Sequence, residues 1–165
     1  ADRAETLARD AAREYEALLT GQPRAFPYRL QAVQAYALLA QLARSKKRYA
    51  EAAKASGRAV ELVDGVLHDY PAFADRRTGG WLHQLRQGLL LAHARSLVDD
   101  RHPDAAARFA AELDPDLPGW AGVQAYNAGC LFALLAAGAD GSTRDEYAAK
   151  AMAWLKKAAA TGYPS

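Results

Sequence analysis

Apolar residues recur along most of the chain with the spacing of an α-helix rather than that of a strand. The first segment shows the pattern as an apolar stripe of Leu7, Ala11, Tyr15, Leu18 and Leu19. Stretches rich in Gly, Pro and polar residues separate such segments. These breaks predict about seven helices, over residues 2–20, 27–44, 49–69, 81–98, 103–113, 120–138 and 143–161.

Local signals mark several of the helix ends. The first helix is expected to stop at residues 21–23, where a glycine is followed by a proline, and Pro27 suits the first turn of the second helix. Residues 72–80 are expected to form a loop or the frayed start of the next helix, and Ser142 or Thr143 is expected to cap the last helix. Because the connections are short, consecutive helices are expected to run antiparallel.

Two of the expected helix pairs carry the same order of large and small residues. In residues 36–62, Leu39 and Ala40 follow Tyr36, and in residues 125–158 Ala128 and Gly129 take their place. The second helices then carry Ala52, Ser56 and Ala59 in the first pair, and Ala151, Leu155 and Ala158 in the other. A mid-helix glycine costs about 1 kcal/mol relative to alanine, so we interpret Gly129 as the residue that lets two helices cross closely.

This pattern resembles the tetratricopeptide repeat, a helix–turn–helix unit of about 34 residues. The resemblance implies an all-α fold, a right-handed α-solenoid of antiparallel helix pairs that spans residues 1–165 as a single domain. The middle pair, residues 81–113, is degenerate, and either Gly88 or Ala94 fits its small position. The first helix resembles the second half of an incomplete unit.

A narrower resemblance concerns the segments YNAGCLFALL and YAAKAMAWLKKAAATGY, near the end of the chain. They are similar to the last repeat of arrays that follow serine/threonine protein kinase domains in some bacteria. The sequence carries none of the kinase motifs that bind nucleotide or perform phosphoryl transfer. Since it also begins with Ala, we expect a fragment of a longer cytoplasmic bacterial protein, from its non-catalytic region.

Composition and charge exclude several classes of partner. The net charge of +2 is close to balance, which predicts neither a nucleic-acid surface nor a membrane-binding patch. The longest apolar run, residues 128–139, is shorter than the roughly 20 residues that span a bilayer, so no membrane insertion is expected. The single cysteine, Cys130, cannot form a disulfide within the chain.

Residues with catalytic or metal-binding potential are scattered. The histidines, at positions 68, 83, 93 and 102, show no metal-ligand spacing and are interpreted as exposed or groove-lining side chains. Cys130 has apolar neighbours and is expected to be a buried structural thiol. The basic run 44–48 is expected to be solvated, with contact to an acidic ligand as the alternative. The sequence therefore predicts no enzyme, no metal and no cofactor.

The three tryptophans fall into two groups. Trp154 lies on the apolar face of the last helix and is expected in the core. Trp81 and Trp120 each follow a glycine and lie at the start of a predicted helix. Either could fasten a helix end to its neighbour, or could be an exposed anchor for a partner.

The function that fits these observations best is protein–protein interaction through a concave surface lined by the first helices of the pairs. The residues expected to contact a protein or peptide partner are Gln34, Gln41, Arg44, Arg86 and Asn127. The Lys and Arg residues with which some tetratricopeptide domains grip a C-terminal carboxylate are not matched here. The alternative is a structural or oligomerisation module without a peptide groove, for which a homodimer is one form.

Overall fold

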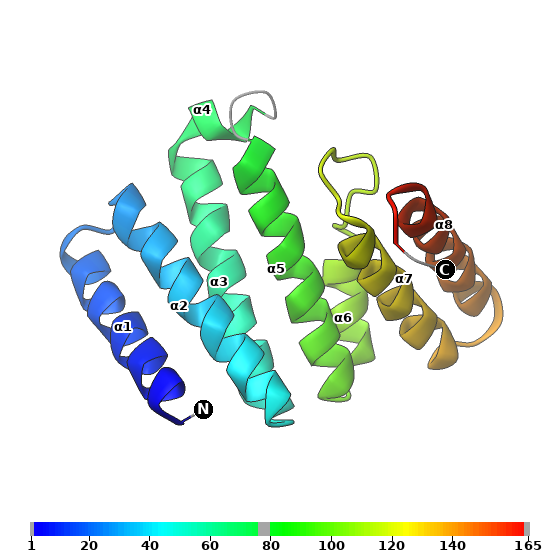
Figure 1. Cartoon of the computed structure of the whole chain (residues 1–165), viewed down its shortest axis with the longest axis horizontal. Helices are drawn as coiled ribbons and strands as arrows, with labels where there is room; N and C mark the ends of the chain where they lie inside the picture. Colours follow the sequence, from blue (N-terminus) through cyan, green and yellow to red (C-terminus); the bar gives the residue numbers. More distant parts are fainter. Residues whose placement is uncertain (1, 76–79, 164–165) are drawn as a thin grey trace. The chain divides into compact units, whose positions relative to one another are not determined.

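The computed structural model describes residues 2–75 and 80–163, and in this part of the chain α-helices are joined by turns and loops, without a strand (Figure 1). The eight helices described are α1 (Asp2–Gly21), α2 (Phe26–Ser45), α3 (Tyr49–Asp69), α4 (Pro71–Ala74), α5 (Gly80–Asp99), α6 (Pro103–Ala110), α7 (Gly122–Ala137) and α8 (Gly141–Ala160). The all-α prediction is confirmed.

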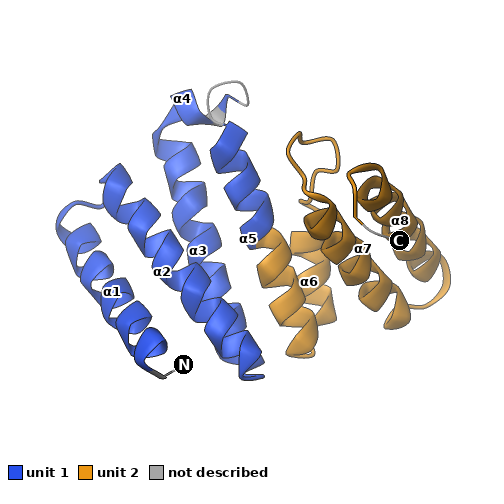
Figure 2. Cartoon of the chain, viewed as in Figure 1, with its two compact units in different colours: residues 1–89 blue, residues 90–165 orange. Residues whose placement is uncertain are grey.

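The helices form two compact units, residues 1–89 and 90–165 (Figure 2). The division falls inside α5, so its first half belongs to one unit and its second half to the other. None of the helices in the described residues is long and apolar enough to cross a membrane.

In the first unit, α2 packs against α1 on one side and α3 on the other. Pro27 lies in the first turn of α2, as expected, and a turn at residues 46–48 reverses the chain into α3. The face of α3 that packs inward carries Ala52, Ser56 and Ala59, all with no exposed surface. The hydroxyl of Ser56 donates to the carbonyl oxygen of Ala52 at 2.7 Å, so this buried polar group is satisfied within its own helix.

In the second unit, α7 and α8 form the most extensively packed pair. A β-carbon built on Gly129 would lie 2.9 Å from two carbons of the Leu155 side chain and 3.4 Å from the carbonyl oxygen of Ala151. Phe132 and Trp154 are buried in the same pair. Gly129 therefore lies at a close helix crossing, as the sequence predicts.

The second half of α5 packs against α6, where the rings of His93 and Phe109 meet edge to face with centroids 4.4 Å apart. His93 is buried, which corrects the expectation of an exposed or groove-lining histidine. Ala94 has no exposed surface, whereas a β-carbon built on Gly88 has no described atom within 4 Å apart from its chain neighbours and the backbone of its own helix. Of the two residues that fit the small position, Ala94 is the one that is packed.

Several predicted boundaries differ from the structure; the helix predicted over 103–113, for example, ends at Ala110. The expected loop contains α4, whose Pro71 occupies the first turn and whose Phe73 ring stacks on Phe26 at 5.1 Å; residues 76–79 of that loop lie outside the described residues. The last helix begins at Gly141, so Ser142 and Thr143 lie inside its first turn instead of capping it. Arg144 holds the turn that precedes this helix, because its Nε donates to the carbonyl oxygen of Ala139 at 3.0 Å.

The apolar stripe of α1 is only partly buried. Ala8, Ala12 and Leu19 face α2 and are buried, whereas Leu7 is 60% exposed and Leu18 is 44% exposed. The two sets occupy adjacent arcs of one helix, and only one arc can rest on a single neighbour. The periodicity thus identifies the helix correctly but not the arc that is covered.

Candidate functional site

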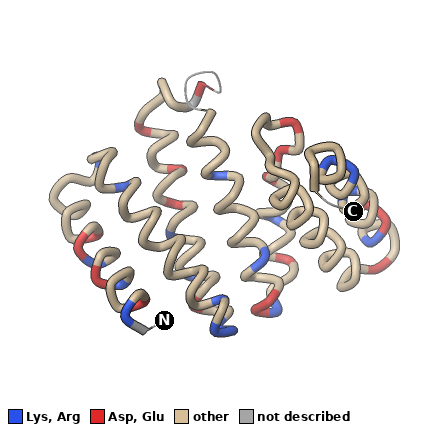
Figure 3. The backbone as a smooth tube through the Cα atoms, viewed as in Figure 1, with Lys and Arg blue, Asp and Glu red and all other residues tan. Residues whose placement is uncertain are grey.

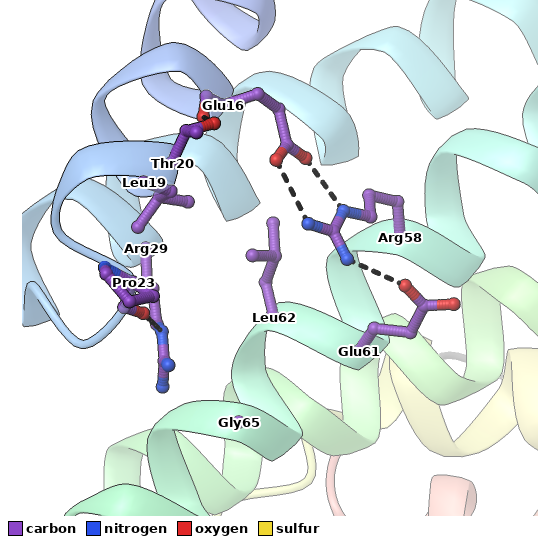
Figure 4. A pocket seen from close by; sticks show the side chains of 9 residues that line it. All are labelled: Glu16, Leu19, Thr20, Pro23, Arg29, Arg58, Glu61, Leu62 and Gly65. Atoms are coloured by element: carbon purple, nitrogen blue, oxygen red, sulfur yellow. Dashed lines mark hydrogen bonds and ion pairs between the residues drawn. The ribbon is translucent and has the colours of Figure 1, made fainter.

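A polar cluster joins the three helices of the first unit (Figure 4). Glu16 of α1 accepts two hydrogen bonds from Arg58 of α3, at 2.7 Å from Nε and 3.0 Å from Nη2. Tyr36 of α2 donates to the same carboxylate at 3.0 Å, and the remaining Arg58 nitrogen, Nη1, donates to Glu61 at 2.9 Å. A two-point contact of this kind fixes orientation as well as distance, so the cluster sets how the three helices lie relative to one another.

The charges of this cluster are stabilised by their neighbours. Hydrogen bonds from Arg58 lower the pKa of Glu16, and Glu16 in turn raises the pKa of Arg58. Burial raises the pKa of the Tyr36 phenol, and the adjacent Glu16 carboxylate raises it further. Glu16 and Arg58 therefore stay charged across the neutral range, whereas the Tyr36 phenol stays protonated.

Beside the cluster lies a pocket of about 290 Å³ between α1, the start of α2 and α3. Figure 4 shows Glu16 and Arg58 on one side of it and Arg29 on the other. The lining residues are Glu16, Leu19, Thr20, Pro23, Arg29, Arg58, Glu61, Leu62 and Gly65. The pocket thus combines leucine and proline side chains with two arginines.

Arg29 is held by two of its nitrogens. Its Nε donates to the carbonyl oxygen of Pro23 at 2.8 Å, and its Nη2 pairs with Asp69 at 2.7 Å, which lowers the pKa of Asp69. Nη1 is buried without a hydrogen-bond partner among the described residues, and a β-carbon on Gly65 would come within 3.3 Å of it. Both arginines of the pocket are thus occupied with internal contacts that connect helices.

A second cluster corrects the interpretation of the basic run 44–48. Lys46 and Arg48 pair with Glu5 of α1 at 2.7 and 2.8 Å, near the turn between α2 and α3, where Figure 3 shows Lys and Arg in blue. Glu5 is buried, and these two cations lower its pKa to about 2. Two members of the run are thus engaged with a buried carboxylate instead of being solvated.

The predicted contact residues lie on three different helices. Gln34, Gln41 and Arg44 are exposed along one face of α2, and Leu38 lies among them with 42% of its surface exposed. Arg86 of α5 pairs with Asp64 of α3, with 2.5 Å between its Nε and the carboxylate. The structure therefore brings the three α2 residues together, whereas Arg86 is engaged in a contact between helices.

Asn127 is exposed on α7, in the second unit. Its neighbours on that helix include Val123 and Leu134, which are also exposed although they are apolar. When the sequences of α2 and α7 are aligned on their buried small residues, Ala40 and Gly129, Gln34 aligns with Val123 and Leu38 aligns with Asn127. In this alignment the exposed residues 34 and 38 match the exposed residues 123 and 127, and the buried residues 40 and 43 match the buried residues 129 and 132, which is a repeat-like architecture.

No family model, curated protein or solved structure matches this chain. The repeat-like architecture is therefore described from the chain's own residues: the small buried positions of α2 and α7, and the order of exposed residues between them.

Trp81 and Trp120 differ in exposure: Trp120 fastens a helix end to its neighbour, whereas Trp81 is exposed. Trp120 is buried; its ring nitrogen donates to the carbonyl oxygen of Asp114 at 2.8 Å, and its ring meets that of Trp154 edge to face at 4.7 Å. It therefore fastens the start of α7 to α8, and Trp154 is in the core as expected. Trp81 is 46% exposed and touches Phe73 at a centroid distance of 6.5 Å, so it keeps the exposure that an anchor requires.

Cys130 is half-buried, which corrects the expectation of a buried thiol. A hydrogen bond with Cys130 raises the pKa of Tyr126, and the ring of Tyr126 stacks on that of Tyr163 with centroids 4.4 Å apart. A β-carbon on Gly122 would lie 2.8 Å from the backbone nitrogen of Tyr163. The chain beyond α8 thus folds back onto the start of α7, which sequence spacing alone does not reveal.

None of the described His, Cys, Asp and Glu side chains gather in groups of three or more that could hold a metal ion. In the clusters of Glu5 and Glu16, ion pairs connect one helix to another. These two clusters thus serve to hold helices together.

Proposed function

We propose that this chain is a tetratricopeptide-like helical module that binds a protein or peptide segment along the exposed faces of its first helices. The observation that carries the proposal is the row on α2 formed by Gln31, Gln34, Leu38 and Gln41, all exposed, with Arg44 beyond them. Amide side chains both donate and accept hydrogen bonds, so they suit the backbone of an extended segment. Leu38 adds an apolar contact among them.

The second pair supports the same proposal with different residues. On α7, Asn127 supplies the amide, and Val123 and Leu134 supply exposed apolar surface. Few charges lie on either face, so we expect a partner of polar or mildly acidic character. Its affinity is expected to be in the micromolar range, about −8 kcal/mol, with weak dependence on salt.

The wider context rests on the segments that resemble repeats following bacterial serine/threonine kinase domains. On that basis we propose that the chain belongs to the non-catalytic region of a larger bacterial protein with a cytoplasmic location. The role is one of scaffolding and not of catalysis, since the ionisable clusters of the first unit serve to connect helices.

The test is a peptide-array or pull-down screen, followed by charge reversals on two helices. Arg44→Glu and Gln41→Glu on α2 are expected to weaken binding. Lys54→Glu is the matched control, because Lys54 is exposed on α3 and its replacement changes the charge as Arg44→Glu does. If Lys54→Glu weakens binding and neither α2 variant does, the assignment to the first helices is wrong.

A second candidate function is a structural or oligomerisation module. The observation that favours it is the exposed apolar surface of α1 and α8, two helices that take no part in the row on α2.

A further inference from the structure

The helix α1 presents a second apolar face that α2 does not cover. Leu7 and Leu18 project from it, with 60% and 44% of their surfaces exposed, and Ala4 and Ala11 lie on the same side. The leucines are three helical turns apart, so they mark a face that runs along most of the helix. Ala8, Ala12 and Leu19 occupy the other arc, against α2, and leave this face uncovered.

The helix α8 presents an apolar face of complementary size. Met152 is 55% exposed, and the exposed Ala148 and Ala159 flank it at helical spacing. The side of α8 that packs on α7 carries Ala151, Trp154 and Ala158. The exposed face is therefore lined by small residues where α1 carries leucines, so that one helix can lie close to the other.

The charges beside these two faces match in spacing and are opposite in sign. Arg3 and Glu14 border the apolar face of α1, and Asp145 and Lys156 border that of α8. In each pair eleven positions separate the charges, about 16 Å along a helix. All four side chains are exposed, and none forms an ion pair with another described side chain.

Helix geometry decides how the two faces fit. Arg3 and Glu14 lie on one flank of their apolar face, and Asp145 and Lys156 on the opposite flank of theirs, as the 3.6-residue period places them. These flanks meet when the two helices run parallel. In that register Arg3 lies beside Asp145 and Glu14 beside Lys156, while Leu18 lies level with Ala160, next to Ala159. An antiparallel arrangement would place the two charged flanks on opposite sides of the contact.

We propose that α1 of one copy packs parallel to α8 of a second copy, so that the chain self-associates head to tail. The two faces are different, so each contact leaves one α1 and one α8 face free at the ends. The assemblies therefore lengthen with concentration unless the rotation closes a ring. The contact uses neither the row on α2 nor that on α7, and does not depend on the proposed partner binding.

Sedimentation velocity over a range of concentrations tests this proposal. The wild-type chain is expected to show a weight-average mass that rises with concentration. Leu7→Asp blocks the α1 face and Met152→Asp blocks the α8 face, and each variant alone is expected to stay monomeric. An equimolar mixture retains one intact pair of faces, so it is expected to form dimers and nothing larger.

Charge exchange tests the register. Arg3→Glu combined with Glu14→Arg is expected to weaken self-association about tenfold, since both pairs become repulsive. Adding Asp145→Arg and Lys156→Glu to the same chain is expected to restore it. Both exchanges leave the net charge of the chain unchanged, so an effect on association reports the local pairs, and circular dichroism verifies that every variant keeps its helices.

Three results would overturn the proposal. A wild-type chain that is monomeric at every concentration would exclude the intermolecular contact. This outcome would also be seen if α1 and α8 of one copy contacted each other. A dimer that Leu7→Asp abolishes and Met152→Asp leaves intact would indicate a symmetric α1–α1 contact. If the variant that carries all four charge substitutions did not regain association, this result would contradict the parallel register.

Discussion

Gly129 of α7 lies so close to Leu155 of α8 that a β-carbon at residue 129 would be 2.9 Å from the leucine side chain. The carbonyl oxygen of Ala151, on the same side, limits how far the backbone of α8 can yield. The glycine is thus retained for close packing in spite of the cost that it imposes on the helix.

Replacing Gly129 by leucine is expected to lower the free energy of unfolding by about 1–3 kcal/mol, because the larger side chain overpacks this crossing. Gly88→Ala is the matched control: no described atom lies near its β-carbon position, so the better helix propensity of alanine should stabilise the chain by about 0.5–1 kcal/mol. Urea unfolding of both variants measures the difference. An unchanged midpoint for Gly129→Leu would mean that the crossing can open without cost.

The Glu5 cluster predicts a dependence of stability on pH. Its folded-state pKa is about 2, below the ordinary value of 4.5, so the unfolded chain binds more protons between these values. The contribution of Glu5 to stability is therefore complete above about pH 4.5 and is lost as the pH falls toward 2. Glu5→Gln is expected to flatten the fall in stability over this window, as followed by thermal unfolding at successive pH values. Glu146→Gln, at an exposed carboxylate of α8, is the control for the loss of one carboxylate.

The contact between Glu16 and Arg58 is expected to couple α1 to α3. A double-mutant cycle with Glu16→Gln and Arg58→Met should give an interaction free energy of about 0.5–1 kcal/mol, because both side chains are partly solvated and water screens the pair. Tyr36→Phe removes the third hydrogen bond and is expected to cost about 0.5–1.5 kcal/mol. If the effects of Glu16→Gln and Arg58→Met on the free energy of unfolding were strictly additive, the contact between these two side chains would contribute no coupling.

Divalent metals and chelators are expected to leave the melting temperature unchanged, since the described His, Cys, Asp and Glu side chains form no group suited to a metal ion. Differential scanning calorimetry with and without zinc and EDTA measures this. A reproducible rise of several degrees with zinc would contradict the prediction, because a ligand that binds the folded state raises its apparent stability.

Much of the fold can be predicted because helical periodicity and Gly or Pro breaks are local signals. The crossing at Gly129 is also predictable, since a glycine within a long apolar helix requires a reason that overrides propensity. The covered arc of α1 is not predictable in this way: Leu7 and Leu19 both fit an apolar stripe, and only the position of α2 decides which is buried.

The polar clusters escape prediction for a different reason. Glu5 meets Lys46 and Arg48, and Glu16 meets Arg58, across long sequence separations and at distances that no periodic pattern encodes. From the sequence alone, the basic run 44–48 therefore has the pattern of a solvated turn, because the carboxylate that pairs with it lies on α1. Of the candidate contact residues, the α2 row could be found from its helical spacing, whereas the pairing of Arg86 with Asp64 required the structure.

The edge-to-face contact of Trp120 with Trp154 gives the chain a built-in optical reporter. Both indoles are buried in the second unit, so their fluorescence is expected at short wavelength and should shift to the red when that unit unfolds. Trp81 belongs to the first unit and already meets solvent, so its emission should change little. Intrinsic fluorescence would therefore follow mainly the second unit, while circular dichroism follows both, and a difference between the two melting curves would reveal whether the units unfold together.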